Sequence, residues 1–299
     1  MTGPGDAPSL GPAAAVPHAV LTVSCADRRG IVATVAGFLA TAGATIVDSQ
    51  QFGDPTTGRF FMRVAVADET GAGWQDTARA FGAPNGPADR FQMIWRLRAV
   101  SGDQRIIVLV SHLGHCLNDL LYRQDVGALP GRIVAVVGNH RDCEPIATRH
   151  DIPFTHLPTT DDRAADEARL LAAVGAVGGE LIVLARYMQV LSDELCHRWS
   201  GRAINIHHSF LPSFKGARPY SQAFDRGVKV IGATAHYVTP ELDEGPIIEQ
   251  EIARVDHSMT PARLAGVGRD LESQALARAV TWHLEDRVLL NGSRTVVFR

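Results

Sequence analysis

The 299-residue chain has few cysteines, and none of them form a pair of the kind that binds zinc or builds a disulfide framework. Its four cysteines, Cys25, Cys116, Cys143 and Cys196, lie far apart and include no C-x-x-C motif. This pattern indicates reduced thiols and favours a cytoplasmic enzyme over a secreted, disulfide-rich protein.

The sequence also lacks a basic excess, a long apolar run and a targeting signal. A net charge of −3 provides no basic surface for nucleic acid, so we expect no nucleic-acid partner. No apolar run reaches the roughly 18 residues that a membrane helix needs, so we expect no membrane partner either. Residues 1–17 are rich in Gly, Pro and Ala and carry no basic n-region, which predicts a flexible tail and not a signal peptide.

Residues 18–100 alternate between strand-like and helix-like segments and form the first predicted domain. A helix over 27–44 follows from the spacing of its apolar residues, with Asp27 as a candidate cap and Gly43 as its end. The complete order, β-α-β-β-α-β, predicts an antiparallel ferredoxin-like sheet with helices on one face. The predicted strands are 18–25, 45–52, 58–67 and 91–100, and the second helix is 74–81.

The stretch "DRRGIVATVAGFLATAGATIVD" in this first domain resembles the start of an ACT-type regulatory domain, a βαββαβ module that binds amino acids. The resemblance implies a small amino-acid effector, with glycine and methionine as the natural candidates. The residues leave open a module that only pairs subunits, because a fold does not fix a function. We expect a homo-oligomer.

Residues 105–299 follow a short linker, "SGDQ", and show a longer rhythm of strand and helix. The strands are nearly continuous runs of Val, Ile and Leu, which is typical of parallel strands covered on both faces. This alternation predicts a doubly wound, mostly parallel α/β domain. In such sheets ligands bind outside the carboxyl ends of the strands.

Polar residues gather where one of these strands ends, in "INIHHSFLPSF" at 204–214. Asn205 and His207 stand at the strand end, and Asp243 follows in a loop that a helix and a returning strand bring back toward them. An amide N–H stabilises an oxygen that gains negative charge, a carboxylate deprotonates water or an amine, and histidine moves protons near neutral pH. Ser209 has no nucleophile-elbow context, so direct attack by water or an amine is favoured over an acyl-enzyme.

Simpler roles exist for each of these residues. An Asn often closes a turn, and a loop Asp often caps one. We expect His208 to point away from His207, because side chains alternate along a strand. His236 is a second candidate that orients Asp243. His140 and Cys143 form a loop pair with too few ligands for zinc, so we interpret them as structural or rim residues.

The segments "NIHHSFLPSFKGARPY" and "GATAHYVTPELDEGPII" together resemble the folate-dependent formyltransferase family. The resemblance implies that Asn205, His207 and Asp243 are catalytic. It also implies that "LARYMQVLS" at 184–192 is a folate-binding loop. The implied substrate contacts are Tyr187, Met188, Gln189, Val190, Leu191 and Gly245.

The turn after the first strand of this domain separates two branches of that family. Transformylases have a Gly-rich turn there that holds the phosphate of an amine substrate. This chain has the bulkier "SHLGHCLNDLL", with His112, Leu113 and His115. The resemblance therefore implies the deformylase branch, which hydrolyses 10-formyltetrahydrofolate to formate and tetrahydrofolate. A closed pocket beside His115 and Cys116 is expected to exclude an amine.

Two other classes stay open at this point: transfer of the formyl group to an amine, and a folate or amino-acid sensor without turnover. We expect no metal and no redox cofactor, and no G-x-G-x-x-G nucleotide motif is present. Folate is the expected small-molecule partner, as substrate. Whether His115, Cys116 or His236 contributes, and how His207 and Asp243 divide their roles, does not follow from the sequence.

Overall fold

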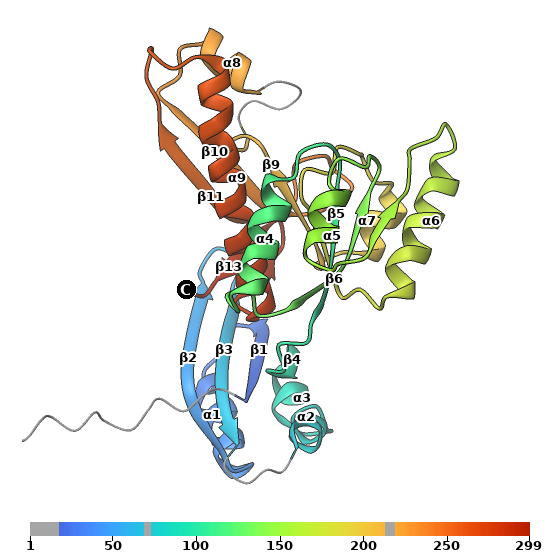
Figure 1. Ribbon diagram of the computed structural model, residues 1–299. Coiled ribbons are helices and arrows are strands. Elements are labelled where there is room, and N and C mark those ends of the chain that lie inside the picture. The colour runs from blue at the N-terminus through green and yellow to red at the C-terminus, as the bar shows by residue number, and fades with distance from the viewer. Residues whose placement is uncertain (1–17, 69–72, 213–218) are drawn as a thin grey trace, which may run out of the picture. The chain divides into compact units, whose positions relative to one another are not determined.

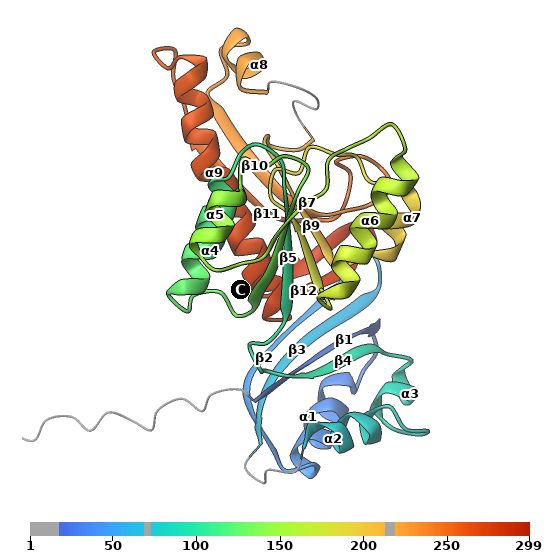
Figure 2. The ribbon, with the colours of Figure 1, turned by 45° about the vertical axis from the view of Figure 1, so that its right-hand side comes forward.

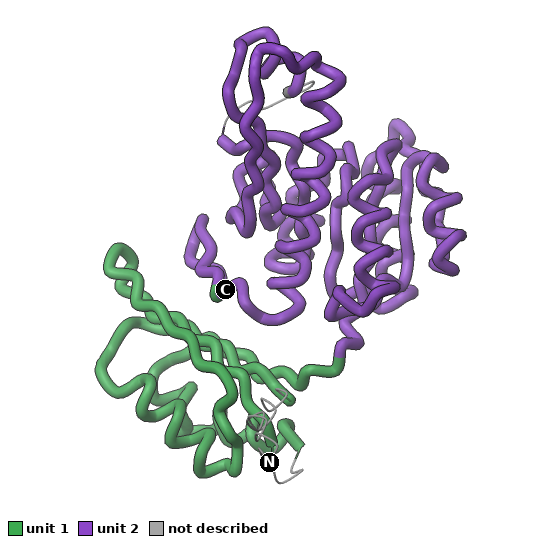
Figure 3. Tube along the Cα trace, turned by 60° about the vertical axis from the view of Figure 1, so that its left-hand side comes forward, with its two compact units in different colours: residues 1–101, 298 green, residues 102–297, 299 purple. Residues whose placement is uncertain are grey.

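The computed structural model describes residues 18–68, 73–212 and 219–299. The chain divides into two compact units, residues 1–101 with 298 and residues 102–297 with 299 (Figure 3). The tail predicted at 1–17 lies outside the described residues. Among the residues in these ranges, none of the helices combines the length and the apolarity that crossing a membrane requires.

The first unit is a four-stranded antiparallel sheet with the strand order β2-β3-β1-β4 (Figure 1). Its elements are β1 (Ala19–Ala26), α1 (Ile31–Thr41), β2 (Ala44–Asp54), β3 (Arg59–Asp68), α2 (Trp74–Phe81), α3 (Pro87–Phe91) and β4 (Ile94–Ala99). The predicted ferredoxin-like class is confirmed. Ile31, Val35 and Leu39 recur at helical spacing on α1 and pack into the core under the sheet.

Two local predictions in this unit are wrong. Asp27 does not cap α1, because the N-cap is Gly30, whose φ of 92° lies in the left-handed region that glycine tolerates. The predicted strand 91–100 begins only at Ile94, because the short helix α3 starts at Pro87 and ends at Phe91. Proline is favoured at the first position of a helix, and Pro87 begins α3 in this way.

The second unit contains a seven-stranded sheet with the order β11-β10-β9-β8-β5-β6-β7. Strands β9, β8, β5, β6 and β7 are parallel, while β10 pairs antiparallel with both β9 and β11. The predicted mostly parallel α/β class is confirmed. Its strands are β5 (Arg105–Val110), β6 (Arg132–Gly138), β7 (Phe154–His156), β8 (Leu181–Leu184), β9 (Ala203–His207), β10 (Val230–Tyr237) and β11 (Ile247–Arg254), followed by the hairpin of β12 (Val288–Asn291) and β13 (Arg294–Val297).

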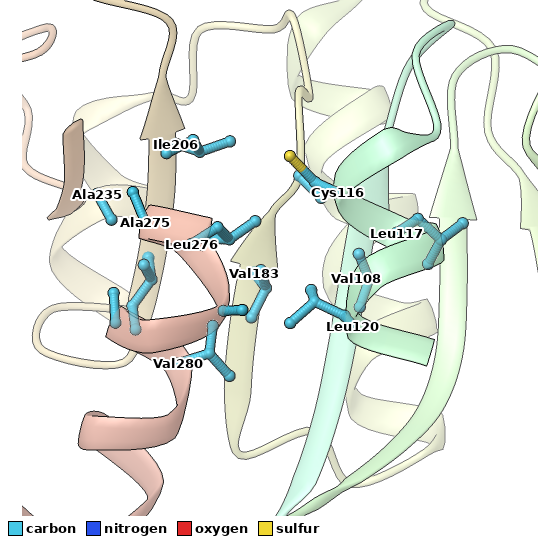
Figure 4. Packing of buried hydrophobic residues seen from close by; sticks show 14 of the residues in the cluster. Val108, Cys116, Leu117, Leu120, Val183, Ile206, Ala235, Ala275, Leu276 and Val280 are labelled. Atoms are coloured by element: carbon cyan, nitrogen blue, oxygen red, sulfur yellow. The ribbon is translucent and has the colours of Figure 1, made fainter. Parts of the chain in front are cut away.

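Helices cover both faces of this sheet, with α4, α5 and α9 on one face and α6 and α7 on the other (Figure 2). The helices are α4 (His115–Asp125), α5 (Glu144–Arg149), α6 (Arg163–Ala176), α7 (Asp193–Arg198), α8 (Pro219–Asp225) and α9 (Pro261–Leu284). In Figure 4, Val108 of β5 and Val183 of β8 pack between α4 and α9. The buried residues of these strands therefore divide between two distinct cores.

Candidate active site

The candidate site begins where β8 and β9 end side by side. Leu184 lies opposite Asn205 in the parallel register, so the two strands end at the same edge of the sheet. Ile204 and Ile206 face the core on the α9 side, while Ala203 faces the core on the α6 and α7 side. By alternation, Asn205 and His207 share the face of Ala203.

Strand β10 brings His236 directly opposite Asn205 in the antiparallel ladder. The Asn205 amide lies 3.2 Å from His236 Nε2, and His236 Nδ1 donates to the carbonyl oxygen of Tyr237 at 2.9 Å. The bond to a carbonyl places the proton of His236 on Nδ1, so Nε2 accepts from Asn205. His236 thereby orients the amide of Asn205 in the site.

Asp243 reaches the site from the loop between β10 and β11. Its Oδ2 lies 3.2 Å from His207 Nδ1, and its Oδ1 lies 3.8 Å from His236 Nε2. The φ of Asp243 is 57°, a left-handed conformation that costs a non-glycine residue about 1–3 kcal/mol. The structure thus brings the three sequence-predicted residues together, with His236 as a fourth member.

The electrostatics of the site favour an ionised Asp243. Burial alone would raise the pKa of its carboxyl group, but the hydrogen bond with the neighbouring His207 is the main influence that outweighs burial and holds that pKa well below its usual range. His207 Nε2 is buried and has no hydrogen-bond partner among the described residues. The ionised carboxylate of Asp243 therefore lies beside His207, whose Nε2 atom is available to a ligand.

A pocket of about 320 Å³ opens at these residues. The folate loop predicted from the resemblance lines it throughout, with Tyr187, Met188, Gln189, Val190 and Leu191, and the opposite wall comes from residues 238–243. Met188 and Val190 are more than half exposed, at 59% and 58%, so the loop presents apolar surface to a ligand. Burial raises the pKa of Tyr187 to about 12, which keeps its phenol neutral.

Gly245, the remaining predicted substrate contact, packs differently. It is not among the described residues that line the pocket. A Cβ atom added there would stand 1.7 Å from the backbone oxygen of Tyr237. The structure gives Gly245 a place in the turn that carries Asp243, and its contact with substrate stays a prediction.

A second group of polar side chains, hereafter the Glu272 cluster, lies on the α9 side of the β9 end. It consists of Glu272, His115, Tyr220 and Arg186. His115 Nε2 lies 2.8 Å from Glu272 Oε2, the Tyr220 hydroxyl donates to Glu272 Oε1 at 2.6 Å, and Arg186 Nε stands 3.5 Å from Oε2. Burial opposes the ionisation of Glu272, but His115, Arg186 and Tyr220 together hold its pKa below its usual range.

The sequence pointed to only part of this cluster. It indicates His115, but the pocket predicted beside His115 and Cys116 is wrong, because neither residue is among the described residues that line the pocket. Arg186 and Tyr220 both fall in segments that carry the family resemblance, "LARYMQVLS" and "NIHHSFLPSFKGARPY", whereas Glu272 has no such signal. The φ of 64° at Arg186 is a further left-handed outlier.

One cysteine, Cys116, belongs to a group of three possible metal ligands, because its Sγ atom and one ligand atom each of His115 and Glu272 all lie within 4.8 Å of one another. Burial raises the pKa of the Cys116 thiol well above its usual range, so it stays protonated beside Glu272. Burial also raises the pKa of Cys143 to about 11, and its thiol donates to the Ser111 carbonyl oxygen.

His140 stacks on the ring of His112, and ligand atoms of these two histidines and of Asp142 all lie within 4.8 Å of one another. Neither His140 nor Cys143 is among the described residues that line the pocket.

His208 makes a testable contribution to pH-dependent stability. Its ring lies between those of His207 and Tyr220, at centroid distances of 5.0 and 6.4 Å. Burial and then the charges of Arg186 and His207 lower the pKa of His208 to about 4, against the opposing influence of Glu272 and Asp243. A folded-state pKa below the unfolded value of 6.5 means that this stability is present above pH 6.5 and is lost as the pH falls toward 4.

We therefore expect His208→Gln to flatten the dependence of stability on pH. The shift corresponds to about 3 kcal/mol in full. Urea unfolding followed by circular dichroism at pH 7.5 and 4.5 measures the difference. An equal loss of stability in both proteins over this interval would show that His208 is not the group responsible.

The second unit has the doubly wound sheet, the Asn/His/Asp group at the β9 end and the apolar pocket of a formyltransferase-type catalytic domain. An ACT module precedes it in the sequence. Family models agree: that for formyl transferase matches residues 104–280, and that for the ACT domain matches residues 19–73. Glycinamide ribonucleotide transformylase 1 from Symbiobacterium toebii matches with a TM-score of 0.64 at 31% identity, over 68% of this chain and 98% of that one.

Similarity to one branch extends over both domains. The chain is 48% identical over 281 residues to the formyltetrahydrofolate deformylase of Corynebacterium sp. (strain P-1), covering 94% of this chain and 98% of that protein. The crystal structure of the formyltetrahydrofolate deformylase from Burkholderia mallei matches with a TM-score of 0.89 at 49% identity, over 95% of this chain and all of that one. The chain belongs to the formyltetrahydrofolate deformylase family.

Proposed function

We propose that this protein hydrolyses 10-formyltetrahydrofolate to formate and tetrahydrofolate. The observation that carries the proposal is the contact of 3.2 Å between His207 Nδ1 and Asp243 Oδ2 at the wall of a ligand-sized pocket. The relatives named above as deformylases support the choice of substrate.

In the proposed mechanism, Asp243 removes a proton from a water molecule that attacks the formyl carbon. The carbonyl oxygen gains negative charge, which His207 and the Asn205 amide stabilise as hydrogen-bond donors. The bond from carbon to the folate nitrogen then breaks, and His207 or Asp243 delivers a proton to that nitrogen. Water is consumed, formate and tetrahydrofolate leave, and no resident metal or redox cofactor takes part.

Incubation of the purified protein with 10-formyltetrahydrofolate and no amine tests this function directly. We expect formate and tetrahydrofolate in equal amounts. A transferase would release no formate and would formylate an added amine, and a sensor would bind the folate without turnover. Either result would contradict the proposed hydrolysis.

Side chains of α6 hydrogen-bond to the proposed folate loop, residues 184–192, and these bonds are expected to affect substrate binding. The Glu167 carboxylate accepts from the Ser192 backbone N–H at 2.6 Å and also from its hydroxyl, while Arg163 donates to the Val190 carbonyl at 2.9 Å. We expect Glu167→Ala to raise KM for the folate about tenfold with little change in kcat, because ordering of the loop then has to occur on binding. Steady-state kinetics measure both constants.

Glu194→Ala is the matched control for that variant, because Glu194 is exposed on α7. Its KM is expected to equal that of the unmodified protein. If Glu167→Ala lowered kcat and left KM unchanged, the loop contact would have a role in the chemical step and not in binding.

We extend the proposal to the ACT domain, which the family-model match at residues 19–73 supports. Glycine or methionine is proposed to bind there and to change the rate of hydrolysis, in a cytoplasmic homo-oligomer. The formate would supply purine synthesis and balance the one-carbon pools. Rates measured with and without each amino acid test the regulation.

A further inference from the structure

We propose that Arg186, at the point where the Glu272 cluster meets the catalytic pocket, binds formate. The inference rests on the proposed function, because formate is the product that the site would receive. It concerns side chains that the proposed mechanism does not use.

Arg186 links the two sides of the β9 end. It follows the last paired residue of β8, Leu184, by two positions, and His207 follows Asn205, the partner of Leu184, by the same number. Arg186 therefore lies just beyond the end of β8, level with the end of β9. Arg186 lines the catalytic pocket and also contacts Glu272 on α9.

Two hydrogen-bond donors in the cluster lack an acceptor in the described part of the chain, and an anion could bind to them. The side chain of Arg186 is only 11% exposed, yet its Nε and Nη1 atoms have no hydrogen-bond partner among the described residues. The ion pair of Nε with Glu272, at 3.5 Å, is too long to be a strong hydrogen bond. Buried N–H groups without an acceptor are rare and unfavourable. The N–H groups of Nε and Nη1 lie on different edges of the guanidinium plane, so each offers a carboxylate a separate charge-assisted hydrogen bond.

The Glu272 carboxylate does not accept a hydrogen bond from every donor in the cluster. Glu272 is bonded by His115 and by Tyr220, so it has partners other than Arg186. His115 Nδ1 is likewise buried without a partner among the described residues. Glu272 therefore fixes Arg186 in place and leaves donors of the guanidinium group for a second, diffusible carboxylate.

The described residues that line the pocket include Arg186 but not Glu272, His115 or Tyr220, so we expect the ligand on the pocket side of Arg186. The side chains of Glu272 and His115 are only 2% and 16% exposed, and Tyr220 packs against them. Formate is the smallest carboxylate and arises at the formyl carbon next to His207. The strained backbone of Arg186 agrees with a functional demand on its side chain, because glycine would occupy a φ of 64° without strain.

Isothermal titration calorimetry with sodium formate on the full-length protein tests the proposal. Arg186→Gly removes the guanidinium group and suits the backbone conformation, so the fold is expected to persist. We expect its affinity for formate to fall roughly tenfold or more, with Arg186→Lys intermediate. Acetate is expected to bind more weakly than formate, and Arg269→Ala, an exposed arginine on α9, is expected to bind formate like the unmodified protein.

A kinetic measurement separates this proposal from the proposed function. If the protein hydrolyses the folate, formate should act as a product inhibitor whose inhibition constant rises in Arg186→Gly by the same factor as the dissociation constant. Hydrolysis with formate binding that is absent or indifferent to Arg186 overturns the formate site and leaves the function intact. Formate binding that depends on Arg186, without any hydrolysis, overturns the function and supports the site. Circular dichroism of each variant verifies folding, and the Arg186→Lys protein decides the matter if Arg186→Gly is misfolded.

Discussion

Replacement of Asp243 by Asn is expected to lower the rate of formate release by about 10²–10⁴-fold, the usual contribution of one proton-transfer group. The carboxylate lies 3.2 Å from His207 Nδ1 and 3.8 Å from His236 Nε2, and chiefly the contact with His207 keeps its pKa low. Asn has the same shape and keeps a hydrogen-bond acceptor for His207, but it cannot remove a proton from water. Formate release from 10-formyltetrahydrofolate measures the effect, with circular dichroism as the test of folding.

Asp270→Asn is the control for that experiment, because Asp270 is exposed on α9 and the same charge is removed. Its activity is expected to match that of the unmodified protein. A folded Asp243→Asn protein that releases formate at a near-normal rate would exclude Asp243 as the general base.

The second large effect is expected from Gly245→Ala, although this residue carries no functional group. The added methyl carbon would stand 1.7 Å from the Tyr237 carbonyl oxygen, which also accepts from His236 Nδ1. Neither backbone can yield without breaking the bond from Tyr237 N–H to the Pro246 carbonyl oxygen, 2.9 Å long. The Asp243 turn must then move, and a displacement of about 1 Å can cost about 10²-fold in rate.

Activity and thermal unfolding of Gly245→Ala measure this effect, and Gly266→Ala is the matched control. An added Cβ at Gly266 meets only the end of the Arg269 side chain, 3.9 Å away, and alanine favours the helix. Gly266→Ala is therefore expected to keep full activity and to unfold at an equal or higher temperature. Equal behaviour of the two variants would mean that the turn accommodates the methyl group.

The sequence was sufficient for the fold class because the local signals and the tertiary structure agree. The Val- and Ile-rich strands of the second unit are buried on both faces, as their continuous apolar runs predicted. Asn205 and His207 were predictable because they end such a strand. The predicted start of α1 was wrong because the helix begins with a left-handed glycine, Gly30, and not with the side-chain cap expected from Asp27.

Long-range pairing explains what the sequence did not reveal about the site. Glu272 sits within a 24-residue helix and looks like any other helical carboxylate in the sequence. Its partner His115 is 157 residues away. No local pattern reports such a contact, and the left-handed conformation of Arg186 is equally invisible in the letters "LAR".

The pairing of β9 with β10 has a consequence for how enzymes of this architecture diversify. Asn205 and His236 face each other across two hydrogen-bonded strands, whereas the lining from Tyr187 to Leu191 belongs to an irregular segment. If the proposed function holds, substitutions in that segment are expected to change which molecule is bound and to leave the paired strands that carry Asn205 and His236 in place. Specificity and reactivity are thus free to evolve at different rates within one chain.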